Sequence, residues 1–311
     1  MTDFFNAWYR ASIYRGGGLF ERFVRNSLHR RVVEKLANFT LPIYYRVTKN
    51  RYKLTPTEGK SPRIILSLTS FPPRIKRLWL VVESLLRQSY RPDVVVLWLS
   101  KEQFPDISAL PKELLAQQSR GLRIEFKEGD LKPHKKYHYA LAEYAEDIVI
   151  TVDDDIFYKR DIISMLVERH RSTPDSIIAN RARSLSFTDT GELAPYNSWS
   201  TSSSCSDDSI NMQTGIGGVL YPPHSLYGDV LDIDLALKLA PKADDLWLFT
   251  MVRLNSRRVC VTDCSTHLLP VLNRGDKSLN SYNITESGND IQIRALREYY
   301  MAELGIDPFA R

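Results

Sequence analysis

The stretch DIVITVDDDIFY at residues 147–158 decides the fold class of this chain. Its first half is an apolar, β-branched run, which predicts a buried strand. The strand ends in three consecutive aspartates, Asp153, Asp154 and Asp155. Like charges side by side repel one another, so this turn needs water or a cation around it. Because alternate side chains of an extended segment share a face, we expect Asp153 and Asp155 to point one way and Asp154 the other.

Strands and helices alternate on both sides of this stretch. Short apolar runs predict strands at 63–70, 94–100, 122–128 and 176–183. Apolar residues at spacings of three and four predict helices at 74–88, 112–118, 135–145 and 160–171. The alternation predicts an α/β fold, a mostly parallel Rossmann-like sheet with helices on both faces, which binds ligands at the carboxyl ends of its strands. The aspartates and the turn TSFPPR at 69–74 both follow such strand ends.

The last third of the chain is less regular. A Ser-rich segment at 196–209 predicts a loop. The Gly-rich segment TGIGGVLYPP at 214–223 predicts a turn that runs into a short strand. Helices are expected at 242–256, which begins with two acids, and at 289–304.

Composition and charge restrict the class of protein. The 311 residues are 43% apolar and 25% charged, which is typical of a globular protein. No run approaches the ~20 apolar residues of a membrane span, and the first residues lack the apolar core of a signal peptide, so we expect a cytoplasmic protein. Residues 1–55 carry eleven Lys and Arg against three Asp and Glu, a net charge of +8, whereas the whole chain is +5. No nucleic-acid-binding motif accompanies this charge, so no nucleic-acid partner is expected.

The basic charge belongs to a predicted N-terminal helical extension over residues 1–60, followed by a main domain over 61–311. Basic and apolar residues alternate there at helical spacing: Arg22, Arg25, Arg30, Arg31 and Lys35 with Phe20, Phe23, Leu28, Val32, Val33 and Leu36. Such a helix either lies on an anionic membrane surface, at the inner face of the cytoplasmic membrane, or packs on the main domain with a solvated basic face. The sequence leaves both open.

The three cysteines, Cys205, Cys260 and Cys264, are an odd number without the spacing of a metal site. Cys260 and Cys264 could pair, but free thiols are expected in a reducing cytosol.

Two carboxylates on one side of the aspartate turn suit a hard divalent ion. Asp153 and Asp155 offer oxygen ligands of the kind that Mg²⁺ and Mn²⁺ prefer. Two carboxylates do not complete six-coordination, so water or a substrate phosphate must supply the remainder, and an ion bridging two phosphates would neutralise a diphosphate leaving group. The alternative is a solvated acidic turn that caps the helix after it. The strand before the aspartates favours the metal site, because it places them where an open sheet binds ligand.

The order of several motifs along the chain resembles that of glycosyltransferases of the GT-A fold, in particular bacterial polysaccharide enzymes related to glycosyltransferase family 2. The resemblance covers about residues 62–300 and is carried by TSFPPR, SLLRQSYRPDVVVLWLS, DLKPHKKYHYALAEY, ITVDDDIFY, TGIGGVLYPP and ADDLWL, in that order. The resemblance implies a GT-A-like fold and a metal-dependent transfer of a sugar from a nucleotide-diphosphate donor, a UDP-sugar by default, to a hydroxyl of a glycan or lipid-linked glycan.

The resemblance also implies donor-site roles. Asp153 would lie near the ribose of the nucleotide, with Asp154 beside it in the motif, and Asp155 would hold Mn²⁺ or Mg²⁺. The loop after the first strand would line the nucleotide pocket with Thr69, Ser70, Pro72 and Arg74. Lys135 or Lys136 would reach a phosphate, which the positive potential at a helix start also favours; solvated lysines are the alternative. His267 is a candidate third metal ligand or an ordinary histidine.

On the acceptor side the resemblance implies that Asp245 is the catalytic base, supported by Asp244. The alternative is a pair of helix-start acids favoured by the helix dipole. The acceptor and donor sugar would border Gly217 and Gly218, and Trp199 could stack on a sugar ring, whereas Trp247 has the spacing of a core residue. The helix at 289–304 would contribute Asn289 and Asp290 to closing the site.

The predicted activity is therefore an inverting, metal-dependent glycosyltransferase in bacterial surface polysaccharide synthesis. One alternative is a phosphohydrolase of the haloacid dehalogenase type, which also has acids after a strand. Ile156 stands where that type has Thr or Val, and no matching acidic cluster after a lysine is clear downstream. A non-catalytic nucleotide- or carbohydrate-binding module is the other alternative, disfavoured by the presence of both acid groups.

Overall fold

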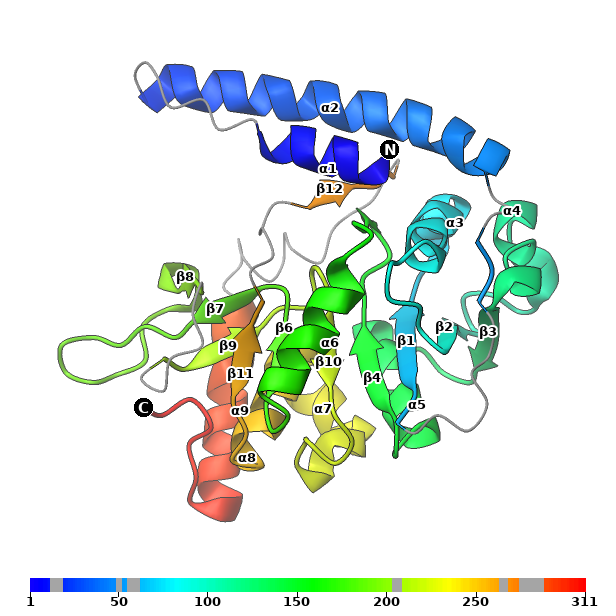
Figure 1. Ribbon diagram of the computed structural model, residues 1–311. Helices are drawn as coiled ribbons and strands as arrows, with labels where there is room; N and C mark the ends of the chain where they lie inside the picture. Colours follow the sequence, from blue (N-terminus) through cyan, green and yellow to red (C-terminus); the bar gives the residue numbers. More distant parts are fainter. Residues whose placement is uncertain (12–18, 49–51, 55–61, 203–208, 263–267, 274–287) are drawn as a thin grey trace.

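A computed structural model of the chain describes residues 1–311 except 12–18, 49–51, 55–61, 203–208, 263–267 and 274–287 (Figure 1). Its centre is a seven-stranded sheet in the order β11-β6-β10-β4-β1-β2-β3. The strands of this sheet are β1 (Ile64–Thr69), β2 (Val94–Ser100), β3 (Leu122–Lys127), β4 (Ile148–Thr151), β6 (Ile177–Ala179), β10 (Val219–Tyr221) and β11 (Val259–Val261). All pairs are parallel except those of β10, which runs antiparallel to β4 and β6. The predicted mostly parallel α/β sheet is confirmed.

Helices cover both faces of this sheet, because successive strand residues point to opposite sides. In β1, Ile64, Leu66 and Leu68 belong to the core that α3 (Pro72–Leu86) and α6 (Ile162–Ser172) share. Ile65 points the other way, to α5 (Lys135–Glu143). The other helices of the domain are α4 (Lys112–Leu115), α7 (Ile233–Leu239), α8 (Asp244–Leu254) and α9 (Gly288–Leu304). The core on the α5 side continues into α7, α8 and α9.

Two small antiparallel sheets flank the carboxyl edge of the central one. One has the order β8-β7-β9, with β7 (Ala182–Ser184), β8 (Ser200–Thr201) and β9 (Asn211–Gln213). The other pairs β5 (Ile156–Phe157), directly after the aspartates, with β12 (Leu269–Pro270).

The N-terminal extension consists of α1 (Thr2–Arg10) and α2 (Leu19–Thr48), and α1 lies between α2 and β12 (Figure 1). The inner face of α2 is fully buried in the same core as α3, through Val33, Ala37, Leu41 and Tyr45. The expected helix therefore exists, and it packs on the main domain. It continues beyond the predicted stretch, through Pro42, to Thr48. The division at residue 60 remains a prediction, since one core joins both parts.

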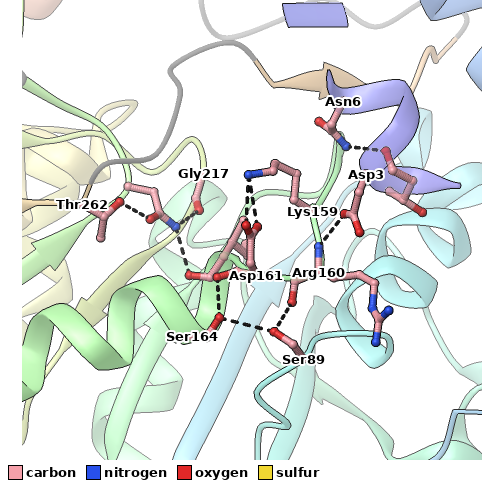
Figure 2. Close-up of polar contacts among 12 residues, drawn as sticks. Asp3, Asn6, Ser89, Lys159, Arg160, Asp161, Ser164, Gly217 and Thr262 are labelled. Atoms are coloured by element: carbon pink, nitrogen blue, oxygen red, sulfur yellow. Dashed lines mark hydrogen bonds and ion pairs between the residues drawn. The ribbon is translucent and has the colours of Figure 1, made fainter. Parts of the chain in front are cut away.

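Figure 2 shows how α1 is tied to the segment that follows the aspartates. The backbone N–H of Arg160 donates to Asp3 Oδ1 at 2.9 Å (Figure 2). The Asn6 Nδ2 also donates to the carbonyl of Phe157, at 3.2 Å. The hydroxyl of Ser89, just after α3, donates to the Arg160 carbonyl at 2.7 Å. These contacts fix the backbone just beyond the aspartate turn from two sides.

Two expectations about particular residues are settled by the structure. Cys260 forms a disulfide, so the expectation of free thiols is wrong for this residue; its partner lies outside the described residues. An odd number of cysteines is compatible with one pair as well as with none, so composition could not decide this. Trp247 is fully buried in α8, which confirms its prediction as a core residue. Within the described ranges, no helix has both the length and the apolar composition needed to cross a membrane.

Candidate active site

A cavity of about 760 Å³ lies at the carboxyl edge of the central sheet, lined by the segments after β1 and β4 and by the starts of α5 and α8. The structure brings most of the predicted site residues to it: Thr69, Ser70, Arg74, Lys135, Lys136, Asp153, Asp154, Asp155, Asp244, Asp245 and Asn289. It does not bring Pro72, Trp199, Gly217, Gly218 or Asp290 to the wall. His267 lies outside the described residues.

The aspartate turn alternates in the way that an extended segment dictates. The side chain of Asp154 is 8% exposed, whereas those of Asp153 and Asp155 are 27% and 32% exposed. Asp154 accepts hydrogen bonds of 2.6 Å from Ser70 Oγ and from Arg74 Nη1. Burial raises the pKa of Asp154, and Arg74 and Ser70 oppose that rise. Asp154 therefore anchors the turn, while its two neighbours face the cavity.

Arg74 joins the turn after β1 to the aspartates. Its Nη1 lies 2.9 Å from Asp155 Oδ2 as well as 2.6 Å from Asp154 Oδ1. The prolines Pro72 and Pro73 open α3, a position where the missing N–H costs no hydrogen bond. The guanidinium of Arg74 also lies over the ring of Phe71, 5.3 Å from its centroid. Because α3 begins directly after β1, Arg74 lies in the first turn of this helix and pairs with the aspartates.

Lys136, at the start of α5, pairs with both groups of acids. Its Nζ lies 2.8 Å from Asp153 Oδ1 and 3.1 Å from Asp244 Oδ2. Burial lowers the pKa of Lys136, but the surrounding carboxylates outweigh it, so the pKa is well above its ordinary value. The central sheet also holds the backbone of Lys136, because the buried hydroxyl of Ser67 in β1 donates to the Lys136 carbonyl. The neighbouring Lys135 is buried and pairs with Asp130.

Gly215 stands at the point where the two acid groups meet. Its N–H donates to Asp245, 3.0 Å from each carboxylate oxygen. A Cβ on this residue would lie 3.0 Å from Lys136 Nζ, 3.2 Å from Asp245 Oδ1 and 3.3 Å from Asp153 Oδ1. A side chain here would therefore force the charged groups apart, which is why the position suits glycine.

The predicted glycines Gly217 and Gly218 serve the turn behind Gly215 rather than the cavity wall. Their φ angles are +96° and +100°, which favour glycine. The Gly217 carbonyl accepts a 2.8 Å hydrogen bond from the buried Asn180, whose Oδ1 accepts one from Thr262 at 2.6 Å (Figure 2). This network holds the glycine turn against the end of β6.

Asp245 differs from the other carboxyls of the cavity. It is partly exposed at the first turn of α8, and its described hydrogen-bond donor is the neutral N–H of Gly215. Burial and the charge of Asp244 raise the pKa of Asp245 to about 7, against the opposing effects of Lys136 and of the Gly215 N–H. A carboxyl with a pKa near neutrality can accept a proton at physiological pH and release it again.

Trp199 lies away from the cavity. The residue is 3% exposed, its ring centroid lies 5.0 Å from that of Tyr196, and its Nε1 donates to the Ala194 carbonyl at 2.8 Å. In this structure the ring offers no face to a sugar in the cavity. Asp290 holds the backbone next to Trp199, because its Oδ1 accepts a hydrogen bond from the N–H of Tyr196 at 2.8 Å.

The sequence reasoning did not single out several residues of the wall. Tyr9 reaches the cavity from α1, so the N-terminal extension contributes to the site. Arg181 comes from the link between β6 and β7, Arg183 comes from β7, and Lys242 precedes α8. The two arginines could have been predicted as site residues, because they occupy alternate positions at the end of the predicted strand 176–183. For Tyr9 no local pattern indicated a site role, because its place depends on how α1 packs.

The donor set fits a divalent cation only in part. Asp153 and Asp155 offer hard oxygen ligands to the cavity, but within the described ranges no group of three or more His, Cys, Asp and Glu side chains is arranged to hold a metal. The arrangement suits an ion that completes its coordination with substrate oxygens and water.

No protein-family model and no curated protein sequence matches the chain. Similar solved structures include the mannosyltransferase PcManGT from Pyrobaculum calidifontis in complex with GDP-Man and Mn²⁺, at 16% identity and a TM-score of 0.45 over 85% of this chain and 73% of that one. TarS from S. aureus in complex with UDP-GlcNAc is 12% identical, with a TM-score of 0.47 over 77% and 73%. A 4-diphosphocytidyl-2C-methyl-D-erythritol synthase from Anaerococcus prevotii is 14% identical, with 0.45 over 76% and 99%. At these identities and TM-scores the likeness carries no information on the reaction.

Proposed function

We propose that the chain is a nucleotide-sugar-dependent glycosyltransferase of the GT-A type. It transfers a sugar from a nucleotide-diphosphate donor to a hydroxyl of a glycan or lipid-linked glycan, in bacterial surface polysaccharide synthesis. The observation that carries the proposal is the meeting of two acid groups in one cavity. Strand-ending aspartates suited to a divalent ion lie beside Asp245, a helix-start carboxyl with a pKa of about 7.

The donor lies along the aspartate turn. Asp153 contacts the ribose side of the nucleotide, and Asp153 and Asp155 are the residues that would hold Mn²⁺ or Mg²⁺. A divalent ion held there would supply positive charge to the leaving diphosphate. Thr69, Ser70 and Arg74, which line the same wall, shape the nucleotide pocket. UDP is the nucleotide proposed first.

Asp245 acts as the general base. It accepts the proton of the acceptor hydroxyl while that oxygen forms a bond to the anomeric carbon. The bond from the anomeric carbon to the phosphate oxygen breaks, and the nucleoside diphosphate leaves with the electron pair. Attack from the face opposite the leaving group inverts the configuration. Asp244 keeps the pKa of Asp245 raised, so that the base works near pH 7.

The reaction can be tested without knowing the acceptor. The protein would be incubated with UDP-, GDP- and CDP-sugars and Mn²⁺, and products would be separated by anion-exchange chromatography. Transfer to water or to added sugar releases the nucleoside diphosphate, and the proposal expects this from one nucleotide class. Release of a nucleoside monophosphate together with a sugar 1-phosphate would contradict it, since those products come from cleavage between the two phosphates and not from sugar transfer.

We also propose that the chain binds an anionic membrane surface, where a lipid-linked acceptor would lie. The face of α2 opposite its buried side carries apolar residues that are 41–81% exposed: Leu28, Val32, Leu36, Phe39, Ile43 and Val47. At 100° per residue these positions form one stripe along the helix, with Arg31 and Lys35 beside it. A continuous apolar stripe edged by basic residues fits the headgroup region of an anionic bilayer, and the net charge of +8 over residues 1–55 supports this orientation.

A further inference from the structure

Two arginines, Arg181 and Arg183, line the cavity without a carboxylate partner in the part of the chain that the structure describes. Arg181 lies between β6 and β7, immediately before Ala182, and Arg183 lies two residues on, in β7; both side chains line the cavity. The other side of the cavity is different, because Arg74, Lys135 and Lys136 each pair with at least one aspartate. Among the residues that the structure describes, no carboxylate forms an ion pair with Arg181 or Arg183.

Among the described residues no ion pair offsets the charge of Arg181, and Asp245 acts on it only at longer range. The Arg181 Nε is buried and has no hydrogen-bond partner among the described residues. Burial lowers the pKa of Arg181, and the like charge of Arg183 lowers it further. Two guanidinium groups held close together in a partly buried place repel each other, so the arrangement is more stable with an anion between them.

Arg183 is held in place by neutral groups. Its Nη1 donates to the carbonyls of Trp199 at 3.0 Å and of Tyr196 at 3.4 Å. Its guanidinium also lies over the Tyr196 ring, 4.8 Å from the centroid. These contacts fix the orientation of the side chain without neutralising it, and its remaining N–H groups can serve a ligand.

The arginine pair belongs to the side of the cavity that holds the base. The backbone N–H of Thr214 donates to the Arg181 carbonyl at 3.0 Å, and Gly215, the next residue, donates to Asp245. The charge of Asp245 acts on Arg181, as its effect on the pKa of the arginine shows. By contrast, β10 separates the end of β6 from the end of β4, which carries the aspartate turn. At ~4.8 Å per strand, the two ends lie about 10 Å apart.

From this placement we infer that Arg181 and Arg183 form an anion subsite for an acidic group, a carboxylate or a phosphate, on the acceptor substrate. The inference rests on the proposed transfer reaction, because that reaction gives the cavity a donor side and an acceptor side. Planar guanidinium groups pair with both anions through two parallel hydrogen bonds. The subsite would select an acidic glycan, such as one containing a uronic acid or a sugar phosphate, over a neutral one.

The experiment compares three sugars that differ only at C6: glucuronate, glucose 6-phosphate and glucose. Their dissociation constants would be measured by ligand-observed NMR with wild-type protein, first without nucleotide and then with UDP and Mn²⁺. We expect wild type to bind at least one of the acidic sugars about tenfold more tightly than glucose, since a charge-assisted pair is worth roughly 1.5–3 kcal/mol. Arg181→Gln and Arg183→Gln should abolish this preference, and Arg181→Lys should retain part of it. Which acidic sugar is preferred distinguishes a carboxylate from a phosphate.

Two controls separate the subsite from other effects. Arg257→Gln removes a surface arginine that pairs with Asp175 and should leave the preference unchanged. UDP affinity should be the same in Arg181→Gln as in wild type. If Arg181→Gln weakens UDP binding as strongly as Asp155→Asn does, the arginines serve the donor phosphates and the inference is wrong. Equal binding of all three sugars by wild type would also overturn it.

Failure of the reaction itself gives a different result. If no nucleotide binds but the acidic preference persists and depends on Arg181, the anion subsite stands and the proposed transfer reaction falls. If a nucleotide binds and no acidic preference exists, the reaction stands and the subsite falls. Circular dichroism and thermal unfolding of each variant would confirm that the fold is retained.

Discussion

The two acid groups of the cavity contain the same side chain in different surroundings. At the aspartate turn, each carboxylate pairs with a cation: Asp154 and Asp155 with Arg74, and Asp153 with Lys136. At the start of α8, Asp244 shares Lys136, while Asp245 accepts from a neutral backbone N–H. Asp245 thus has no cation paired with it among the described residues, and burial together with the charge of Asp244 raises its pKa to about 7.

The difference indicates two chemical roles for similar residues. Carboxylates that are paired with cations at a strand end suit the holding of a divalent ion and a diphosphate, whereas a carboxyl with a pKa near neutrality suits proton transfer. Lys136 connects the groups, because it contacts an acid of each. Substitutions in the aspartate turn should therefore affect the protein differently from substitutions at the start of α8.

The largest effect is expected from Asp245→Asn, which removes the proposed base and keeps the shape of the side chain. Sugar transfer from the donor identified by the product screen should fall by about 10²–10⁴-fold, the typical contribution of a general base. Initial rates measured at saturating donor check this. The matched control is Asp234→Asn, an exposed acid in the first turn of α7, which should retain full activity. An equal loss in both variants would contradict the role of Asp245.

Asp244→Asn should shift the pH dependence rather than abolish the reaction. The base must be deprotonated to work, so the rate should rise with pH through about 7 in wild type. The charge of Asp244 raises the pKa of Asp245, and removing it should move this rise to lower pH. The pH profile of kcat/KM measures the shift. If the rise of kcat/KM moved to higher pH instead, a group other than Asp245 would be responsible for it.

Gly215→Ala should push the aspartate turn and the acids of α8 apart, because it inserts a methyl group between them. The new Cβ would lie 3.0 Å from Lys136 Nζ and 3.2 Å from Asp245 Oδ1, so these groups must move by a few tenths of an ångström. We expect a loss of activity of about tenfold to a hundredfold, because misplaced catalytic groups lower the rate steeply. Gly228→Ala, where no atom lies within 4 Å of the added Cβ, is the control and should leave the rate unchanged.

The smallest effect on the reaction is expected from the outer face of α2, which lies away from both acid groups. The double variant Phe39→Ser and Val47→Ser removes two of the most exposed apolar side chains of the stripe. Binding to vesicles containing phosphatidylserine at low salt should fall about tenfold, while activity on a soluble acceptor stays the same. Ile107→Ser, at an exposed apolar residue outside α2, should not change vesicle binding. Undiminished binding of the double variant would remove the stripe as a membrane contact.

The sequence predicted the sheet and the helices on both its faces, because strand-length apolar runs and helical spacing alternate regularly from 63 to 183. It also placed the aspartates and the FPPR turn together, since both follow parallel strands that end at the same edge. Helix lengths were less accurate: the helix expected at 112–118 spans only Lys112–Leu115. Propensity alone does not determine where a short helix ends.

Much of the cavity wall depends on tertiary packing and could not be read from local patterns. Tyr9 reaches the site because α1 packs beneath α2, about 140 residues before the aspartates in the chain. Gly215, rather than Gly217 or Gly218, contacts the acids, and only the conformation of the turn decides between them. Arg181 stands out only once the ion pairs of its neighbours are known.

The most direct test of the difference between the acid groups is calorimetric titration of UDP, GDP and CDP with Mn²⁺ into three proteins: wild type, Asp155→Asn and Asp245→Asn. We predict that wild type binds one nucleotide in a metal-dependent manner, that Asp155→Asn loses this binding, and that Asp245→Asn retains it. Loss of binding in Asp245→Asn with retention in Asp155→Asn would contradict the assignment of the donor to the aspartate turn and of the base to α8.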